Sequence, residues 1–112
     1  MTIPPDLDTV EKFLDELRAI CGLRPNIDIL QRNKNREFIQ RSGITENEIN
    51  EIIFVALNPG YYKSGPETEQ DNRFPPGVIY KFNYQWKSFE IYIKIKIFIA
   101  ERRTAICMSF HD

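Results

Sequence analysis

The stretch from Phe89 to Phe98 reads FEIYIKIKIF, and it decides the expected fold. Side chains of a β-strand alternate between its two faces. One face of this strand would carry four isoleucines, Ile91, Ile93, Ile95 and Ile97. The other would carry Glu90, Tyr92, Lys94 and Lys96. The pattern therefore predicts a strand with one face in a hydrophobic core and a phenol and two amines on the opposite face.

The final segment, TAICMSFHD from Thr104 to Asp112, alternates in the same way. Its apolar face would hold Ile106, Met108 and Phe110, and its opposite face Ala105, Cys107, Ser109 and His111. If the two segments pair as a hairpin through residues 100–103, the tyrosine, the lysines and the only histidine line one side of a sheet. Such a surface is suited to binding a phosphate group.

Three amphipathic segments precede these strands and predict helices. The first begins at Asp8 as its N-cap and ends near Cys21 and Gly22, with apolar residues at helical spacing. The second, Asn33 to Arg41, is anchored by Phe38 and Ile39 and closed by Ser42-Gly43. Between them, residues 26–31 (NIDILQ) fit an edge strand or an extended connection.

The third helix begins at a capping box, Thr45 to Glu48, and is stopped by Asn58-Pro59-Gly60. Residues 61–76, rich in proline and polar side chains, are expected to form a long loop. Gly77 to Tyr84 predicts another strand, with a bulky core face of Val78, Tyr80, Phe82 and Tyr84 and an opposite face of Ile79, Lys81 and Asn83.

Together these elements predict an α+β fold, in which three N-terminal helices pack on one face of a small antiparallel sheet. We expect a single domain over residues 1–112, with a helical part at about 1–58, a loop at 59–76 and antiparallel strands at 77–112. A chain of 112 residues is long enough for one core and too short for two.

The composition, 42% hydrophobic and 28% charged, is that of an ordinary soluble protein. No apolar run is long enough for a membrane span, and the N-terminus does not resemble a signal peptide. Cys21 and Cys107 lack metal-site spacing, which favours two buried, reduced thiols in a cytoplasmic protein. Net charge is −3 over residues 1–57 and +2 over 58–112, so we expect a polyanion to meet the C-terminal half.

The polar side of the predicted sheet carries side chains that metal-independent RNA cleavage requires. Attack of a ribose 2′-hydroxyl on the adjacent phosphate needs a proton acceptor, cations that offset the growing charge, and a donor for the leaving oxygen. These roles suit Tyr92, the lysines at 81, 94 and 96, and His111. A solvated sheet face is, however, the commoner origin of an alternating Ile/Lys strand, and on pattern alone we favour it.

Three local motifs favour the catalytic interpretation, because they occur in the same order in a known family. They are Gly60-Tyr61-Tyr62-Lys63-Ser64, Ile91-Tyr92-Ile93-Lys94 and Ser109-Phe110-His111-Asp112. In these motifs and in its order of elements, the chain resembles the MqsR family of type II toxins. That resemblance implies a RelE-like fold and mRNA endoribonuclease activity, neutralised by a cognate antitoxin protein.

The resemblance also implies roles for individual residues. It makes Lys63, Tyr92 and His111 catalytic, with His111 in place of the family's lysine, and Tyr62, Lys81 and Lys94 substrate-binding. Lys96 has no counterpart and is expected in solvent. The implied reaction uses no metal or cofactor, its substrate is mRNA, on the ribosome or free, and the antitoxin would cover the open sheet face. The alternative is a non-catalytic module that binds RNA or a protein through this face.

Overall fold

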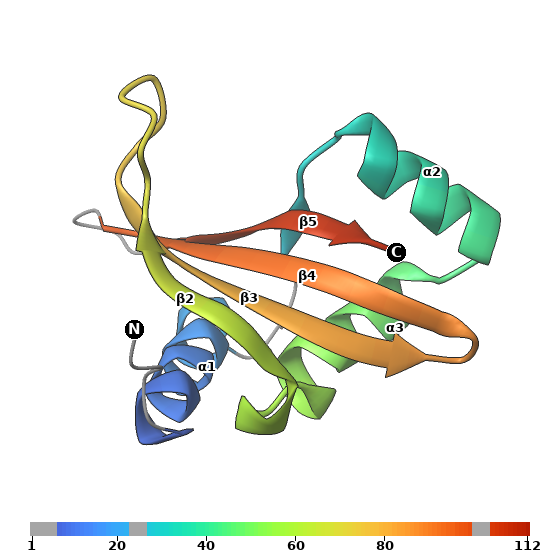
Figure 1. Cartoon of the computed structure of the whole chain (residues 1–112), viewed down its shortest axis with the longest axis horizontal. Coiled ribbons are helices and arrows are strands. Elements are labelled where there is room, and N and C mark those ends of the chain that lie inside the picture. The colour runs from blue at the N-terminus through green and yellow to red at the C-terminus, as the bar shows by residue number, and fades with distance from the viewer. Residues whose placement is uncertain (1–6, 23–26, 100–103) are drawn as a thin grey trace.

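The computed structural model describes residues 7–22, 27–99 and 104–112. Within these ranges the chain has an α+β architecture (Figure 1). Its helices are α1 (Leu7–Cys21), α2 (Asn33–Ser42) and α3 (Glu46–Glu51). Its strands are β1 (Asp28–Ile29), β2 (Tyr62–Thr68), β3 (Gly77–Trp86), β4 (Phe89–Phe98) and β5 (Ala105–His111). The predicted turn at residues 100–103 lies outside the described residues.

The strands form one mixed sheet in the order β1-β5-β4-β3-β2. Strands β2 to β5 pair antiparallel, as predicted for β3, β4 and β5. The short β1 pairs with β5 in parallel, so the expectation of a purely antiparallel sheet is wrong. Because β1 lies between α1 and α2, the expectation that all helices precede the sheet strands is also wrong. A two-residue strand has too little alternation to reveal its direction or partner.

The predicted loop at residues 59–76 is partly wrong, since β2 occupies Tyr62–Thr68 at the edge of the sheet. Its pairing with β3 is interrupted between Tyr62 and Ser64 and again between Ser64 and Glu67. Pro66 has no backbone N–H to donate, which an edge strand tolerates because one side of its backbone has no strand partner. Glycine and proline in this segment therefore marked an irregular edge strand rather than a loop.

The helix boundaries follow local signals. The Thr45 hydroxyl oxygen accepts from the Glu48 backbone N–H at 3.2 Å, and the Glu48 carboxylate accepts from the Thr45 N–H at 3.1 Å, which confirms the capping box. After α3 the chain continues as a π-helical turn, Ile52–Ala56. Gly43 ends α2 with φ 73°, a left-handed conformation that glycine adopts without a steric penalty. Asp8 lies inside the first turn of α1, so its predicted N-cap role is wrong.

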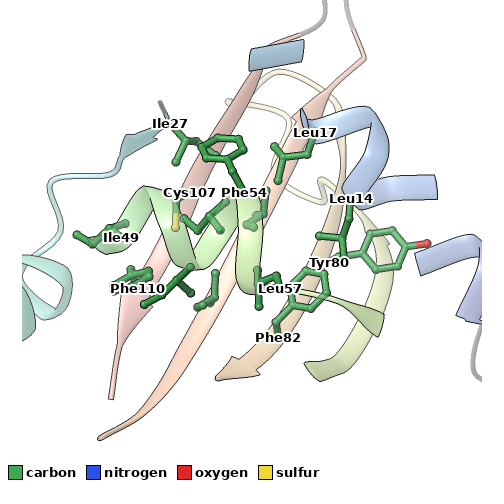
Figure 2. Close-up of a cluster of buried hydrophobic side chains, with 14 of the residues drawn as sticks. Leu14, Leu17, Ile27, Ile49, Phe54, Leu57, Tyr80, Phe82, Cys107 and Phe110 are labelled. Atoms are coloured by element: carbon green, nitrogen blue, oxygen red, sulfur yellow. The ribbon is translucent and has the colours of Figure 1, made fainter. Parts of the chain in front are cut away.

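The core lies between the sheet and the helical layer, and Figure 2 shows part of it. All four isoleucines of FEIYIKIKIF are buried, which confirms the predicted core face of β4. They pack with one side of α1 and with residues of α3 and its π-helical extension. Burying an isoleucine side chain contributes about 1.5–3 kcal/mol, so this row alone stabilises the fold substantially. Tyr80 and Phe82 of β3 are buried in the same core, as predicted.

The alternation predicted for the last strand is wrong in its first half. The pairing of β4 with β5 shifts by one residue, because Lys94 lies opposite Ser109 while Ile95 lies opposite Cys107. Met108 is the extra residue of this bulge. Cys107 consequently faces the core, as Figure 2 shows, while Ile106 and Met108 lie on the opposite face. His111 and Phe110, beyond the bulge, keep the predicted orientation.

Asn35 of α2 completes the outer edge of β5 next to the bulge. Its side-chain oxygen accepts from the Phe110 N–H at 2.9 Å, and its amide nitrogen donates to the carbonyls of Met108 at 3.1 Å and Leu30 at 2.9 Å. Only 1% of Asn35 is exposed. The amide therefore satisfies backbone groups that β1 is too short to pair, and it holds α2 beside β5 (Figure 1).

Cys107 is fully buried, as predicted, and burial raises the pKa of its thiol to about 12. Cys21 is only half-buried, so the prediction of two buried thiols holds for one of them. None of the helices within the described ranges has the length and apolarity needed to cross a membrane.

Candidate functional site

The face of the sheet opposite the core gathers four of the predicted site residues through strand register. Lys81 of β3 lies directly opposite Lys94 of β4, and Tyr92 of β4 lies directly opposite His111 of β5. Residues 92 and 94 of one strand share a face, so all four side chains belong to the same surface. We call this surface, together with Lys63 of β2, the open-face cluster.

Tyr92 lies at the centre of this cluster. Its ring centroid is 5.6 Å from that of His111 and 5.0 Å from Nζ of Lys63. A cation over an aromatic face is attracted by the electron density of the ring. The structure thus brings together Lys63, Tyr92 and His111, the three residues predicted to be catalytic, from three different strands.

His111 is positioned by its neighbour Asp112, which Arg41 holds in place. Its Nδ1 lies 2.9 Å from the Asp112 backbone oxygen, which can only accept a hydrogen bond. This contact favours a proton on Nδ1, which leaves Nε2 of the neutral ring as the acceptor. Asp112 is held by Arg41 of α2 through two hydrogen bonds of 2.7 and 2.8 Å, which lower the pKa of its carboxyl.

The two opposed lysines have different surroundings. Lys81 Nζ donates to Glu67 Oε1 of β2 at 2.8 Å, and this hydrogen bond is the main reason that the pKa of Lys81 is raised. The pKa of Lys94 is lowered, first by partial burial and then by the charge of Lys81. Within the described part of the chain, Lys94 forms no ion pair. Of these two lysines, Lys94 is therefore the one that gives up its proton more readily.

Lys96 is not in solvent, and its predicted exposure is wrong. Only 2% of the residue is exposed. Its Nζ donates to Glu69 Oε1 and to the Pro75 carbonyl oxygen, each at 2.6 Å, and lies 5.0 Å from the Phe98 ring centroid. The segment between β2 and β3 folds over this lysine and supplies its partners, which the alternation of β4 alone could not reveal.

Tyr62 does not join the cluster. It pairs with Phe82, packs against the hydrophobic core, and its hydroxyl donates to the Gly65 carbonyl oxygen at 2.6 Å. Its neighbour Lys63 reaches the open face instead. A substrate-binding role for Tyr62 therefore has no support in the geometry.

Beyond Lys94 the same face continues into a pocket of about 320 Å³ that the sequence did not reveal. Its walls come from the β1–α2 connection, the β2–β3 connection, β4 and β5. Its lining includes Arg32, Phe74, Lys94, Phe98, Ile106 and Met108. The only local sequence feature that could have indicated this pocket is Phe74, an isolated aromatic residue in a polar segment.

No group of three histidine, cysteine, aspartate or glutamate side chains in residues 7–22, 27–99 and 104–112 is arranged to hold a metal ion. In comparisons with protein-family models, curated proteins and solved structures, none matches this chain.

Proposed function

We propose that this protein is an mRNA endoribonuclease that cleaves by attack of a ribose 2′-hydroxyl on the scissile phosphate. It would act as the toxin of a type II toxin–antitoxin pair, with a RelE-like fold, in the cytoplasm where mRNA is found. The observation that carries the proposal is the open-face cluster, which combines a tyrosine, a histidine and three lysines on four strands. The buried residues of α1 and α3 pack on the opposite side of the sheet, and α2 lies beside β5 (Figure 1).

The register of the cluster suits an acid–base pair. Lys94 and His111 are diagonal neighbours on the paired strands β4 and β5, and such neighbours are roughly 7–8 Å apart. This separation leaves room for a phosphate between their side chains. We assign to Lys94 the acceptance of the 2′-hydroxyl proton, because partial burial and the charge of Lys81 lower the pKa of its amine. The protonated His111 ring donates to the 5′-oxygen as the P–O5′ bond breaks.

The remaining residues orient the substrate and offset its charge. Tyr92 lies between the acid and Lys63, where its hydroxyl hydrogen-bonds the reacting ribose or phosphate. Lys63 and Lys81 offset the charge that grows on the phosphorus-bound oxygens. The 2′-oxygen bonds to phosphorus as the 5′-oxygen leaves, so the products are a 2′,3′-cyclic phosphate and a free 5′-hydroxyl. These side chains supply every role, so the proposed mechanism includes no metal or cofactor.

An antitoxin that binds the open face would exclude RNA from the cluster. The charges there favour an acidic partner segment, since Lys63 and Lys94 form no ion pair within the described residues. The competing function is a non-catalytic module that binds RNA or a protein on the same surface.

A cleavage assay separates the two functions. Purified wild type, His111→Ala and Lys12→Ala, the last a charge-removing control on α1, are incubated with a structured mRNA, and the product ends are analysed. We expect 2′,3′-cyclic phosphate ends from wild type and control and a strong loss with His111→Ala. Equal cleavage by all three would remove His111 from the chemistry. RNA binding without cleavage by wild type would establish the non-catalytic module.

A further inference from the structure

The pocket beyond Lys94 has walls of two kinds. Six apolar residues line it: Leu30, Phe74, Pro75, Phe98, Ile106 and Met108. Charged residues also line it. Lys96 is paired with Glu69, and Asp71 is paired with Arg73, whereas Arg32 and Lys94 form no ion pair with a residue that the structure describes, so the unpaired charge of the lining is positive. A ligand that fits must therefore combine a flat or compact apolar body with negative charge. At about 320 Å³ the pocket holds one small group rather than a folded chain.

The shape of the pocket is fixed by hydrogen bonds of a buried lysine, Lys96. Lys96 lines the pocket, and its Nζ donates to Glu69 Oε1 and to the Pro75 carbonyl oxygen. These contacts keep the β2–β3 connection, which projects from the sheet in Figure 1, against β4. Phe74, one residue before Pro75, is consequently held at the pocket, where it remains 53% exposed. An exposed phenylalanine beside cations is a feature of surfaces on which nucleobases stack.

Lys94 belongs both to this pocket and to the open-face cluster. Tyr92, two residues along β4, lies roughly 6.6 Å further on, a span of about one extended nucleotide. A ribonucleotide with its 3′-phosphate at the cluster would thus have its base at the pocket. The bulge at Met108 contributes to this arrangement, because it turns Ile106 and Met108 toward the pocket while Ser109 and His111 remain on the cluster side.

We propose that this pocket binds the unpaired nucleobase of the nucleotide on the 5′ side of the scissile phosphate, the nucleotide whose 2′-hydroxyl attacks. Phe74 and Phe98 supply ring faces, Ile106 and Met108 supply the apolar floor, and Arg32 meets the preceding phosphate. This inference rests on the proposed function for its substrate, RNA, but it concerns a separate set of residues. It makes the protein selective for single-stranded sites, since a base within a duplex cannot enter the pocket.

Methyl NMR titrations test the pocket directly. The probes are the four ribonucleoside 3′-monophosphates, with the uncharged nucleosides, inorganic phosphate and an acidic leucine-rich peptide as comparison ligands. We expect the methyl resonances of Ile106 and Met108 to move with the nucleotides, weakly with nucleosides, and not with phosphate alone. The methyl group of Ile49, in the core on the helix side, should stay unchanged. If these resonances moved with the peptide and with none of the nucleotides, the proposal would be overturned in favour of a protein ligand.

A variant pair tests the aromatic contact. Phe74→Ala should weaken nucleotide binding roughly tenfold, or about 1.4 kcal/mol, because the variant loses one stacking contact to the base. Val55→Ala shortens another exposed apolar side chain, on the π-helical turn, and should leave binding unchanged. Nucleotide binding that Phe74→Ala leaves intact, or Ile106 and Met108 resonances that stay still at saturation, would overturn the pocket.

The experiments distinguish failure of the base pocket from failure of the nuclease activity. Wild type that cleaves RNA while the pocket resonances stay unchanged would overturn the base pocket and leave the nuclease. Wild type that binds nucleotides at Ile106 and Met108 but leaves RNA intact would overturn the nuclease and support the pocket. Cleavage of a duplex RNA as fast as a single strand of the same sequence would also contradict the pocket.

Discussion

Tyr92 and His111 lie directly opposite each other on β4 and β5, with ring centroids 5.6 Å apart. Different contacts fix the position of each residue. The β4 isoleucines bury one face of the strand and so direct Tyr92 to the other. Arg41 holds Asp112, and the Asp112 carbonyl contacts the His111 ring. The half-buried tyrosine and histidine are thereby held in a defined arrangement.

Tyr92→Phe tests the hydroxyl at the centre of the cluster. The ring contacts with Lys63 and His111 should persist, so the fold and RNA affinity should change little. We expect the cleavage rate to fall about 10- to 100-fold, the cost of losing a hydrogen bond to a charged transition state. Single-turnover cleavage kinetics measure this rate. A rate equal to wild type would show that the hydroxyl takes no part in the reaction.

Glu67→Gln should strengthen RNA binding. Glu67 pairs with Lys81 at 2.8 Å, so removing the carboxylate charge leaves the lysine free to meet a phosphate. Binding to a single-stranded RNA should tighten severalfold, and the slope of log K against log salt should steepen by about 0.7, the value for one more phosphate contact. Glu46→Gln, the same charge change on the helix side, is the control. Equal tightening in both would mean that net charge alone is responsible.

Asn35→Leu should destabilise the fold strongly. The change leaves the Phe110 N–H and the Met108 and Leu30 carbonyls without their buried partner. We expect the free energy of unfolding in urea to fall by about 3 kcal/mol, because each unsatisfied buried group costs about 1–3 kcal/mol. Lys34→Ala, at the exposed neighbouring position, should change it by less than about 0.5 kcal/mol. A small effect of Asn35→Leu would mean that water or a backbone shift replaces the amide.

The Lys96–Glu69 pair should make stability depend on acid pH. The hydrogen bond from Lys96 lowers the pKa of Glu69 below its ordinary value of 4.5. A carboxylate with a lowered folded-state pKa stabilises the fold fully above its unfolded pKa, and this contribution is lost as the pH falls through the folded pKa. Wild type should therefore be more stable than Glu69→Gln at neutral pH, and the difference should shrink as the pH falls below 4.5.

Thermal unfolding at a series of pH values measures this difference. Glu90→Gln, an exposed strand carboxylate with no ion pair within the described ranges, is the matched control. A gap between wild type and Glu69→Gln that stays constant from neutral to acid pH would contradict the role assigned to the pair.

Several features of the fold follow from local sequence. The capping box at Thr45, the glycine end of α2 and the isoleucine face of β4 are set by neighbours within a few residues, and all are confirmed. The direction of β1, the edge strand β2 and the bulge at Met108 depend on partners distant in the chain. Their short or irregular patterns carry no information about those partners.

In the candidate site, too, some features follow from local sequence and others depend on partners distant in the chain. FEIYIKIKIF by itself determined that Tyr92 and Lys94 share the face opposite the core, because side chains in a strand must alternate. Tertiary structure alone decided that Lys96, on that same face, is buried under the β2–β3 connection while Lys94 is only half-buried, beside a pocket. The physical reason is that burial of a charged side chain depends on its partners, here Glu69 and the Pro75 carbonyl, and only folding brings them to the strand.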